Sequence, residues 1–585
     1  MIKKLFLYTF FLSLSLIAQG QGELVPMIST YFGGNQGDWI QGVCQDSDGN
    51  YYISGSTIST NLPVTIGAYQ SNYSGAGDVF IAKFSPSLNL IWCTYFGGNS
   101  LECYPAIIVS DDGYIYLSFY TVSDDLIAPD DTLYQYHGGV DPYIAKFNLD
   151  GNFIWGKYFG SGFNENSIAL SFSQNSLILS YLRKNMPAYN PIPPSGPYYS
   201  YNNLNLFDNF ESYSSSGLSY YASVLKLNFD GNCTESISIG FNTSMVANSQ
   251  RQTLNEKLIF PIGVAGGPQT AYLPDGTSLD QSDRFLQTCF FEFDLDSLEL
   301  LHYSYSFPVI ALNPIRFLQL AENKRYYSMA FTNMYPDAMP PLVGNFGSQL
   351  PVNSSSNQIP DGYHQLLDTT ETIIWSGNIF ASAISAENAV FLDGADIIKL
   401  GNAQEIYPYA VNGNFSGSTE DGSVVIFDGA MNLVLSTLFG GSGDDYFYSG
   451  MDIGDQTFLA VGSSSSIDYP TTANAFQSQN AGSIDGILTI FKYNHVGIEE
   501  LTESSSGYRV YPLPAKESVT IELKENEFVN QSKLFNATGS LIDIQSNPSS
   551  NQRLTLKTAD LLSGLYLVQL YHGNSFVGSV KIVVE

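Results

Sequence analysis

The feature that most limits the folds open to this chain is a sequence repeat of about 64 residues. The motif Thr-Tyr-Phe-Gly-Gly at 30–34 returns at 94–98, and related segments stand at 155–160 and 437–441. A second motif, Asp-Val-Phe-Ile-Ala-Lys-Phe at 78–84, returns at 141–147. Weaker copies of it end at Leu227, Phe293, Leu367, Phe427 and Phe491. These copies predict seven units, because a fixed period of this length is typical of solenoids and propellers.

Each unit has the pattern of four short strands. In the first unit we expect strands at 41–45, 51–55, 79–84 and 90–95, which are rich in Val, Ile, Tyr and Phe. The turn between the first two strands contains Gly49, a residue that accepts positive φ without steric cost. Four-stranded units at this spacing predict an all-β fold, a β-propeller, in which radial repetition leaves only short, protected edges.

The seventh unit lacks a fourth strand of its own. After Phe491 the chain runs directly into Asn494-His495-Val496-Gly497, and the one unassigned copy of a fourth strand is Met27–Phe32 at the other end. We therefore predict a seven-bladed β-propeller at 23–496 that is closed by its N-terminal strand.

The two ends of the chain differ from the repeats. Lys3 and Lys4 precede an apolar run at 5–17 and small residues at 18–20, which predicts a secretory signal peptide at 1–22. No later segment approaches 18 apolar residues, so no transmembrane segment is expected in the mature chain. Residues 497–507 form a polar, acidic linker, and 508–585 read as a small β-sandwich-like domain.

Both parts resemble known families. The motifs Tyr-Phe-Gly-Gly, Asp-Gly-Asn-Tyr-Tyr-Ile-Ser-Gly and Leu-Pro-x-Thr-x-Gly-Ala-Tyr-Gln resemble the bacterial β-propeller repeat called SBBP. The C-terminal segment resembles the type A sorting domain of the type IX secretion system, found in Bacteroidetes-like bacteria, with Leu513 as a departure from the usual Asn. The residues that carry this second resemblance are Tyr511, Pro512, Pro514, Gly539, Gly564, Tyr566 and Lys581.

The sorting-domain resemblance implies a route and partners. It implies passage through the periplasm and across the outer membrane, with the type IX secretion machinery as a partner. It also implies removal of the domain by a sortase-like processing protease of that system. The mature protein is then either released or attached to surface lipopolysaccharide, and we expect it to be a monomer.

Charge and motif content exclude several functions. Lys and Arg number 23 against 55 Asp and Glu, a net charge of −32, which repels nucleic-acid phosphates and anionic membrane surfaces. The chain has no H-E-x-x-H, nucleophile elbow or Walker loop, and its five cysteines and five histidines lack metal-ligand spacing. Most cysteines are expected to be small buried residues, and one disulfide, involving Cys93 and Cys103, is left open.

We expect no cofactor, with Ca²⁺ left open. Acid pairs such as Asp46/Asp48 and Asp444/Asp445 stand at turns, where oxygen ligands suit calcium. The same Asp-rich turns also arise when an Asp side chain caps its own turn. No full calcium loop is present in the sequence.

The candidate binding residues lie in an unusual segment at 186–221. Five prolines are followed by aromatics among Asn and Ser, and rigid aromatics beside small polar residues suit glycan or protein binding. An ordered surface loop that packs its own rings is the alternative. The aromatic residues singled out are Tyr198, Tyr199, Tyr201, Phe207 and Phe210.

The sequence favours an exported, non-enzymatic binding or adhesion scaffold for a glycan or a protein. The alternative is a secreted polysaccharide-degrading enzyme, a lyase or glycosidase, with its site at the mouth of the propeller channel. Propellers host both functions, so the fold does not choose between them. Scattered acids and few bases, without a catalytic cluster, favour the scaffold.

Overall fold

The computed structural model divides into two compact units, Leu24–Asn494 and a second unit of Met1–Glu23 with His495–Glu585. It describes 23–129, 134–160, 164–173, 176–184, 420–428 and 433–494, together with shorter strand segments between 220 and 403 and between 508 and 584. The expected signal peptide and linker lie outside the described residues. Every element of regular structure named in the described part is a β-strand, so the fold is all-β as expected.

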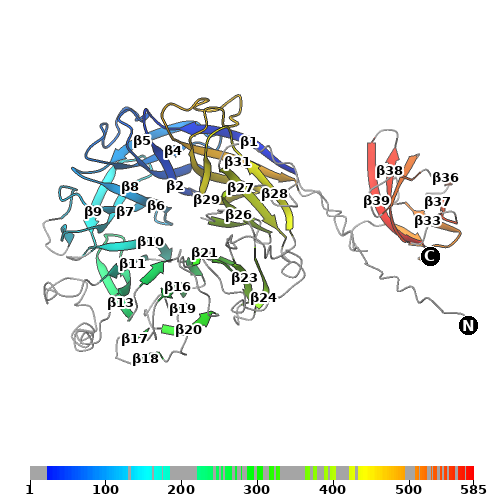
Figure 1. Ribbon diagram of the computed structural model, residues 1–585. Coiled ribbons are helices and arrows are strands. Elements are labelled where there is room, and N and C mark those ends of the chain that lie inside the picture. Colours follow the sequence, from blue (N-terminus) through cyan, green and yellow to red (C-terminus); the bar gives the residue numbers. More distant parts are fainter. Residues whose placement is uncertain are drawn as a thin grey trace, which may run out of the picture. The chain divides into compact units, whose positions relative to one another are not determined.

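The described strands of the first unit form seven sheets of four to six strands. The first two sheets contain β2 (Asp38–Gln45), β3 (Tyr51–Thr57), β4 (Asp78–Phe84) and β5 (Leu90–Phe96), and then β6 (Glu102–Val109), β7 (Tyr114–Thr121), β8 (Asp141–Asn148) and β9 (Phe153–Tyr158). These eight strands lie where the repeat places them. Figure 1 shows the sheets of this unit following one another in chain order around a common centre.

The third to sixth sheets continue this order. The third sheet contains β10 (Glu165–Ser173), β11 (Ser176–Lys184), β12 (Tyr220–Leu227) and β13 (Cys233–Phe241), and the fourth contains β14 (Met245–Asn248), β15 (Gln252–Leu254), β16 (Lys257–Ala265), β19 (Leu286–Asp294) and β20 (Leu300–Ser306). The fifth sheet contains β21 (Ile315–Ala321), β22 (Lys324–Met329), β23 (Tyr363–Asp368) and β24 (Ile373–Asn378). The sixth sheet contains β25 (Asn388–Leu392), β26 (Asp396–Ala403), β27 (Asp421–Phe427) and β28 (Leu433–Phe439). The sequence did not predict one addition, a short hairpin of β17 (Ala271–Tyr272) and β18 (Ser278–Leu279). It pairs with β13 and extends the third sheet to six strands.

The last sheet of this unit joins the two ends of the repeat region. Its order is β1 (Glu23–Phe32), β31 (Asp485–Asn494), β30 (Thr457–Ser464) and β29 (Asp445–Gly454), so the N-terminal strand pairs with the last strand. Figure 1 shows blue β1 beside gold β31. The Tyr31 hydroxyl donates to the Ser466 carbonyl at 2.7 Å and accepts from the Tyr469 amide at 2.9 Å. Strand β2 of the first sheet contacts β29, β30 and β31.

Neighbouring sheets are held together by apolar side chains from both faces of the strands. Strand β4 is buried at six of its seven positions, as expected for a strand covered on two sides. Phe32, Ile40 and Phe80 share one core cluster with Leu459 and Leu488, which unites the first sheet with the last. Further clusters join the first sheet to the second, the second to the third and the sixth to the last. Cys93 is buried in one of these clusters, and it and Cys103 are free thiols rather than the disulfide considered from sequence.

The C-terminal unit consists of two four-stranded sheets. One contains β32 (Arg509–Tyr511), β33 (Ser518–Glu522), β37 (Arg553–Lys557) and β36 (Ser546–Ser549), and the other contains β35 (Leu541–Ile542), β34 (Gln531–Asn536), β38 (Gly564–His572) and β39 (Ser575–Val584). Val519 and Leu556 of the first sheet share one core with Leu534, Val568 and Ile582 of the second. Within the described residues, no helix is long and apolar enough to span a membrane.

Candidate functional site

The sheets meet at a glycine turn that is followed by a buried acid. The Gly34 amide donates to Asp38 Oδ2 at 2.7 Å, and the hydroxyls of Thr57 and Ser59 donate to the same carboxylate at 2.5 and 2.8 Å. The Asp38 side chain is completely buried at the start of β2. Burial raises its pKa, and these three donors oppose the rise.

The same arrangement recurs at other sheets. Glu102 at the start of β6 accepts from the Gly98 amide at 2.9 Å and from the hydroxyls of Thr121 and Ser123 at 2.6 Å each. Asp445 at the start of β29 accepts from the Gly441 amide at 2.7 Å and from a serine hydroxyl at 2.8 Å. The acid therefore belongs to the repeated scaffold.

In four sheets a second buried acid, at the start of the third strand in chain order or, in the last sheet, of β31, approaches the first. A Cβ added to Gly33 would lie 2.6 Å from Asp485 Oδ1 and 2.8 Å from Asp38 Oδ2, so only glycine fits between these two carboxylates. Gly97 lies in the same way between Asp78 and Glu102. Equivalent pairs are Asp421/Asp445 and Asp141/Glu165.

Burial and the neighbouring acid raise the pKa of the second acid. Burial is the main cause at Asp78, whose pKa rises to about 7, with a smaller contribution from the charge of Glu102. Burial likewise raises the pKa of Asp485 to about 6, and the charge of Asp38 adds to it. Oδ1 of Asp78 and Oδ1 of Asp485 are buried without a hydrogen-bond partner among the described residues. A proton on one acid of each pair would remove the repulsion between the two carboxylates. It would also give the buried carboxylate oxygen a hydrogen that it can donate.

The innermost strand of several sheets contains a β-bulge, a shift in its pairing register with the next strand. Each bulge lies within three residues of the acid that starts the strand. The pairing of β2 with β3 shifts at Gln41, that of β6 with β7 at Tyr104 and Pro105, and that of β29 with β30 at Tyr448. Strand β10 shifts between Asn166 and Ala169, which brackets Ile168. A bulge of this kind re-aims a side chain, and bulges are common next to binding and active sites.

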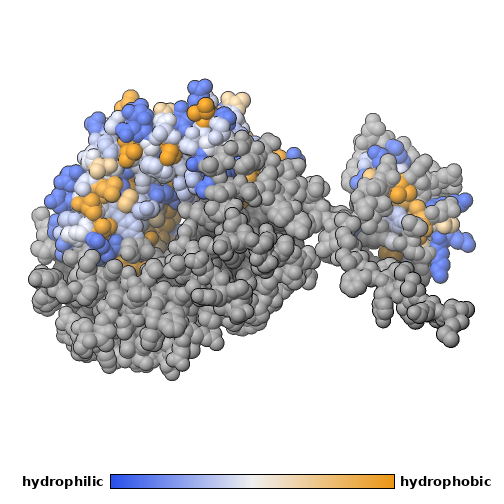
Figure 2. Space-filling model, in the orientation of Figure 1, coloured by the Kyte–Doolittle hydropathy of each residue, from blue (hydrophilic) through white to orange (hydrophobic). Residues whose placement is uncertain are grey.

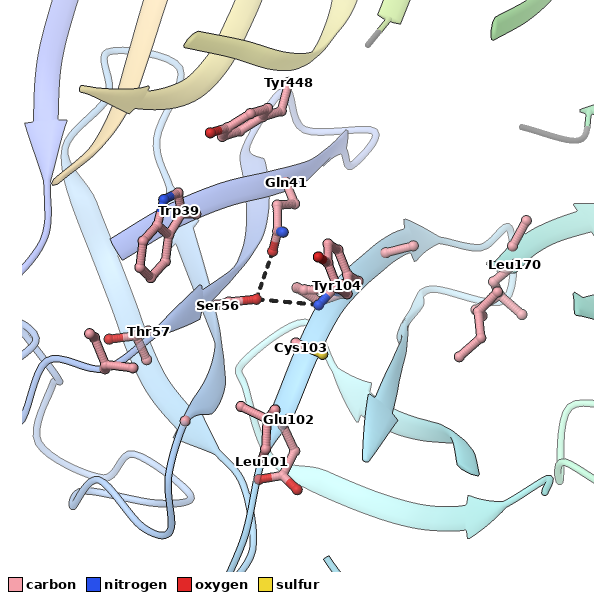
Figure 3. A pocket seen from close by; sticks show the side chains of 16 residues that line it. Trp39, Gln41, Ser56, Thr57, Leu101, Glu102, Cys103, Tyr104, Leu170 and Tyr448 are labelled. Atoms are coloured by element: carbon pink, nitrogen blue, oxygen red, sulfur yellow. Dashed lines mark hydrogen bonds between the residues drawn. The ribbon is translucent and has the colours of Figure 1, made fainter. Parts of the chain in front are cut away.

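The bulged residues line one cavity of about 790 Å³. Its walls come from β2, β3, β6, β10 and β29, so four sheets contribute to it (Figure 3). Aromatic and amide side chains dominate the part nearest the bulges: Trp39, Gln41, Tyr104 and Tyr448. Among the described lining residues there is no Lys, Arg or His, and Glu102 is the one carboxylate.

Tyr104 is the most exposed aromatic residue of this cavity. Its side chain is 66% exposed, and it packs edge-on against Tyr120 with ring centroids 6.1 Å apart. Its backbone has a φ of 53°, a left-handed conformation that costs a residue with a side chain of order 1 kcal/mol. The Tyr104 amide donates to Ser56 Oγ at 3.3 Å, and that hydroxyl donates to Gln41 Oε1 at 2.8 Å. Strain of this kind concentrates at ligand-contacting positions.

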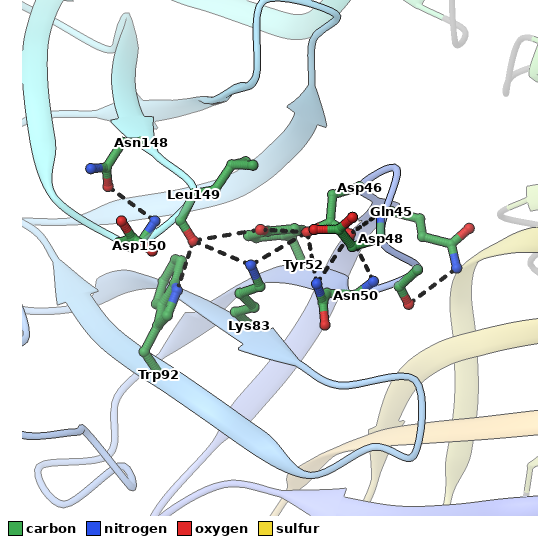
Figure 4. Close-up of polar contacts among 11 residues, drawn as sticks. Gln45, Asp46, Asp48, Asn50, Tyr52, Lys83, Trp92, Asn148, Leu149 and Asp150 are labelled. Carbon is green, nitrogen blue, oxygen red and sulfur yellow. Dashed lines mark hydrogen bonds and ion pairs between the residues drawn. The ribbon is translucent and has the colours of Figure 1, made fainter.

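The acids of the Asp-rich turns, for which calcium binding was left open, hydrogen-bond and ion-pair with other side chains. Asp46 accepts from Asn50 and from the Tyr52 hydroxyl, and its Oδ2 lies 3.3 Å from Lys83 Nζ (Figure 4). The Trp92 indole and Lys83 both donate to the Leu149 carbonyl of the next sheet. Asp112 and Lys146 repeat this network one sheet further on, at 3.0 Å. In the described part of the chain, no group of three or more His, Cys, Asp or Glu is placed to hold a metal ion.

The candidate loop residues Tyr198, Tyr199, Tyr201, Phe207 and Phe210 lie outside the described residues. The cavity residues were not among the binding residues predicted from sequence, which came from the aromatic segment at 186–221. Their signal was available, since Gln41 and Tyr448 occupy the same position of the aligned first and last units yet differ in chemistry.

The sorting-motif residues lie in and around the C-terminal sheets. Tyr511 ends β32, 40% exposed, and its hydroxyl donates to Glu522 at 2.8 Å. Pro512 and Pro514 follow it and lead to buried Ala515, whose amide donates to the Val583 carbonyl of β39 at 2.7 Å.

Three of the remaining motif residues belong to the second sheet of this unit, and one lies outside the described residues. Gly564 begins β38, Tyr566 is buried in that strand, and Lys581 lies in β39 opposite Leu567. Gly539 is outside the described residues. The motif thus contributes to the first and last strands of this unit.

Two family models match the chain. Residues 28–63 match the model of the beta-propeller repeat, and residues 509–585 match that of the secretion system C-terminal sorting domain. Both resemblances expected from sequence are confirmed. The sorting domain implies interaction with the type IX secretion machinery and supports secretion or an outer-surface location. No curated protein matches the chain.

Solved structures resemble it only distantly. A protein of unknown function from Dyadobacter fermentans has a TM-score of 0.34 and 9% identity, covering 80% of this chain and 99% of its own. A polysaccharide lyase described as an ulvan lyase has a TM-score of 0.35 and 11% identity, covering 67% and 79%. An alpha-L-arabinanase from Penicillium chrysogenum has a TM-score of 0.34 and 10% identity, covering 79% and 98%. Similarity at this level transfers neither an activity nor a ligand.

Proposed function

We propose that this protein is an exported binding scaffold that holds a glycan in the cavity at the inner strands, without cleaving it. The observation that carries the proposal is the cavity itself. Four sheets converge on it, and aromatic and amide side chains at strand bulges line it. Pockets of this composition, apolar and aromatic with a few placed polar groups, are typical ligand sites.

The scaffold we propose for this site is a seven-bladed propeller closed by its N-terminal strand. Seven sheets in the first unit support it, as do the pairing of β1 with β31 and the contacts between β2 and the last sheet. A closed ring would hold the bulged strands at constant separation, which keeps the cavity preformed. Preformed sites avoid part of the ordering cost of binding.

The acid pair beside the cavity argues against the enzyme alternative. Glycosidases need two carboxyl groups with different protonation at the scissile bond. Asp78 and Glu102 form such a pair, but pairs in equivalent positions recur at three other sheet junctions. Glu102 is 1% exposed and its oxygens already accept from Gly98, Thr121 and Ser123. A group engaged in this way is part of the scaffold.

The export route is proposed to end with removal of the C-terminal unit by the sortase-like protease of the system. The protein then acts at the cell surface or outside the cell. Deleting 508–585 should leave the protein in the periplasm, as measured by fractionation and immunoblotting. Normal surface delivery of this truncation would overturn the export proposal.

Binding is tested with the purified full chain on a printed array of glycans and matrix proteins. We expect saturable binding to glycans, with no release of reducing ends or unsaturated products from any bound polymer. Exclusive binding to proteins, or turnover of a bound glycan, would overturn the proposal.

A further inference from the structure

We propose that the ligand is an uncharged sugar unit and that the bulge residues of strands β2, β6, β10 and β29 determine which sugar is held. This inference rests on the proposed glycan-binding function and specifies its substrate class. The bulge residues are Gln41, Tyr104 with Pro105, Ile168 and Tyr448.

The first support is the contrast between neighbouring positions of one strand. In three sheets the acid that starts the inner strand, Asp38, Glu102 or Asp445, has the same kinds of partners, namely a glycine amide and a nearby hydroxyl. Three residues later the side chain changes from Gln41 in the first sheet to Ile168 in the third and Tyr448 in the last. Because all three line the same cavity, the repeat supplies a constant frame and a variable lining.

The second support is the chemistry of that lining. A pyranose presents an apolar C–H face and a rim of hydroxyls. Tyr104, Tyr448 and Trp39 supply flat apolar surface for the face. The Gln41 amide and the Ser56 hydroxyl supply donors and acceptors for the rim, and they are already hydrogen-bonded to each other at 2.8 Å, which limits their motion.

The third support is charge. Uronate and sulfate groups are recognised by Arg and Lys, which form charge-assisted hydrogen bonds with them. No described residue of the lining is cationic, and the chain carries a net charge of −32. An anionic sugar would lose its hydration in this cavity without gaining a cation, so neutral sugars are favoured.

The test measures binding of the full chain to three neutral polymers (laminarin, xyloglucan, mannan) and three anionic ones (alginate, polygalacturonate, carrageenan) by affinity electrophoresis and calorimetry. We expect binding to at least one neutral polymer and to none of the anionic ones. Tyr104→Ala and Tyr448→Ala should each weaken that binding about tenfold, because each variant removes a ring that stacks on the sugar. Ile467→Ala is the matched control, because Ile467 is 80% exposed and does not line the cavity.

A charge-swap variant tests the selectivity directly. Gln41→Arg should add binding to an anionic polymer, while Gln41→Ala should only weaken binding to the neutral one. Melting temperatures equal to that of the unaltered chain show that the variants are folded.

The outcomes separate the two claims. Binding to anionic polymers alone, or neutral binding that none of the bulge substitutions changes, overturns this inference and leaves glycan binding in place. Failure to bind any of the six polymers, with no binding on the glycan array, removes the proposed function and this inference with it.

Discussion

The sheet junctions and the cavity are built from the same strands, yet they differ in how far the repeat is preserved. At the junctions, Asp38, Glu102 and Asp445 meet the same kinds of partners in each sheet. Within three residues, at the bulges, the side chains differ in size and polarity. In these three sheets, positions that join neighbouring sheets keep the same kinds of partners, while nearby positions that face the cavity differ in chemistry. The predictions below test whether stability and binding separate in the same way.

The largest effect is expected from filling a junction. Gly97→Val should lower the free energy of unfolding by about 3 kcal/mol, because any side chain there overlaps the carboxylates of Asp78 and Glu102. Urea denaturation of the full chain measures the loss. An unchanged unfolding midpoint would contradict the view that these carboxylates are tightly packed.

A smaller loss is expected where a repeated hydroxyl is removed. Tyr95 donates to the Ser59 carbonyl at 2.9 Å and accepts from the Leu62 amide at 2.8 Å, as Tyr31 and Tyr158 do at their own loops. Tyr95→Phe should cost about 1–2 kcal/mol, because two buried backbone groups lose their partner. Tyr104→Phe is the control, and an equal loss in that variant would refute the assignment.

The junction acids also predict a pH dependence. Burial holds the pKa of Asp78 near 7 and that of Asp445 and Asp485 near 6, above the ordinary range of an aspartate. The folded chain therefore binds more protons than the unfolded chain between about pH 4 and 7. Their contribution to stability is complete below the ordinary pKa and is lost as the pH rises through 6 and 7.

Most of the groups that face these three acids are themselves acidic, and they contribute to the pH dependence. Asp78 faces Glu102 and Gln70, Asp445 faces Asp421, and Asp485 faces Asp38. The melting temperature should fall from pH 5 to pH 8, and Asp78→Asn should reduce this fall. Asp48→Asn, at an exposed turn, serves as the control. A melting temperature that rises over this interval would show that the pairs do not hold extra protons.

The smallest effect on stability is expected in the cavity. Tyr104→Ala should change the free energy of unfolding by less than about 0.5 kcal/mol, since the ring is largely exposed and alanine keeps the Cβ that the backbone already accommodates. Urea denaturation beside Gly97→Val gives the comparison. A loss as large as that of the junction variant would mean that this residue serves the fold.

Figure 2 adds a related contrast for the surface. On the described sheets, apolar side chains occur singly or in small groups among polar ones, and the exposed large residues include Ile66, Ile127 and Ile154. Scattered apolar residues of this kind are normal for a protein surface. Recognition is therefore expected in the cavity rather than on this face.

Much of the fold was predictable because each strand repeats a local pattern. The strands around Tyr51, Val79 and Leu90 lie where alternation and turn residues placed them, and β1 pairs with β31 in the last sheet. The hairpin of β17 and β18 was not foreseen, because it lies in an insertion without repeat signal. The sorting domain was identified correctly from its motifs, with Ala515 and the final strand joined by a hydrogen bond.

The cavity was harder to predict than the strands. A bulge depends on the pairing register between two strands, so it cannot be predicted from a single residue such as Gln41 or Tyr104. The paired acids show a similar limit, since Asp78 and Glu102 stand 24 positions apart in sequence and meet only across a glycine. Both the bulge residues and the paired acids can be located by comparing equivalent positions in successive units.

We expect Glu102, the acid beside the cavity, to join neighbouring sheets, and we expect the cavity to bind a polymer without cleaving it. The most direct measurement follows the polymer bound most tightly by the full chain, with and without Glu102→Gln, recording both affinity and chain length of the polymer over time. The account predicts that both proteins bind the polymer with similar affinity and that its length stays constant in each. Shortening of the polymer by the unaltered chain, abolished in Glu102→Gln, would contradict the account and make this acid catalytic.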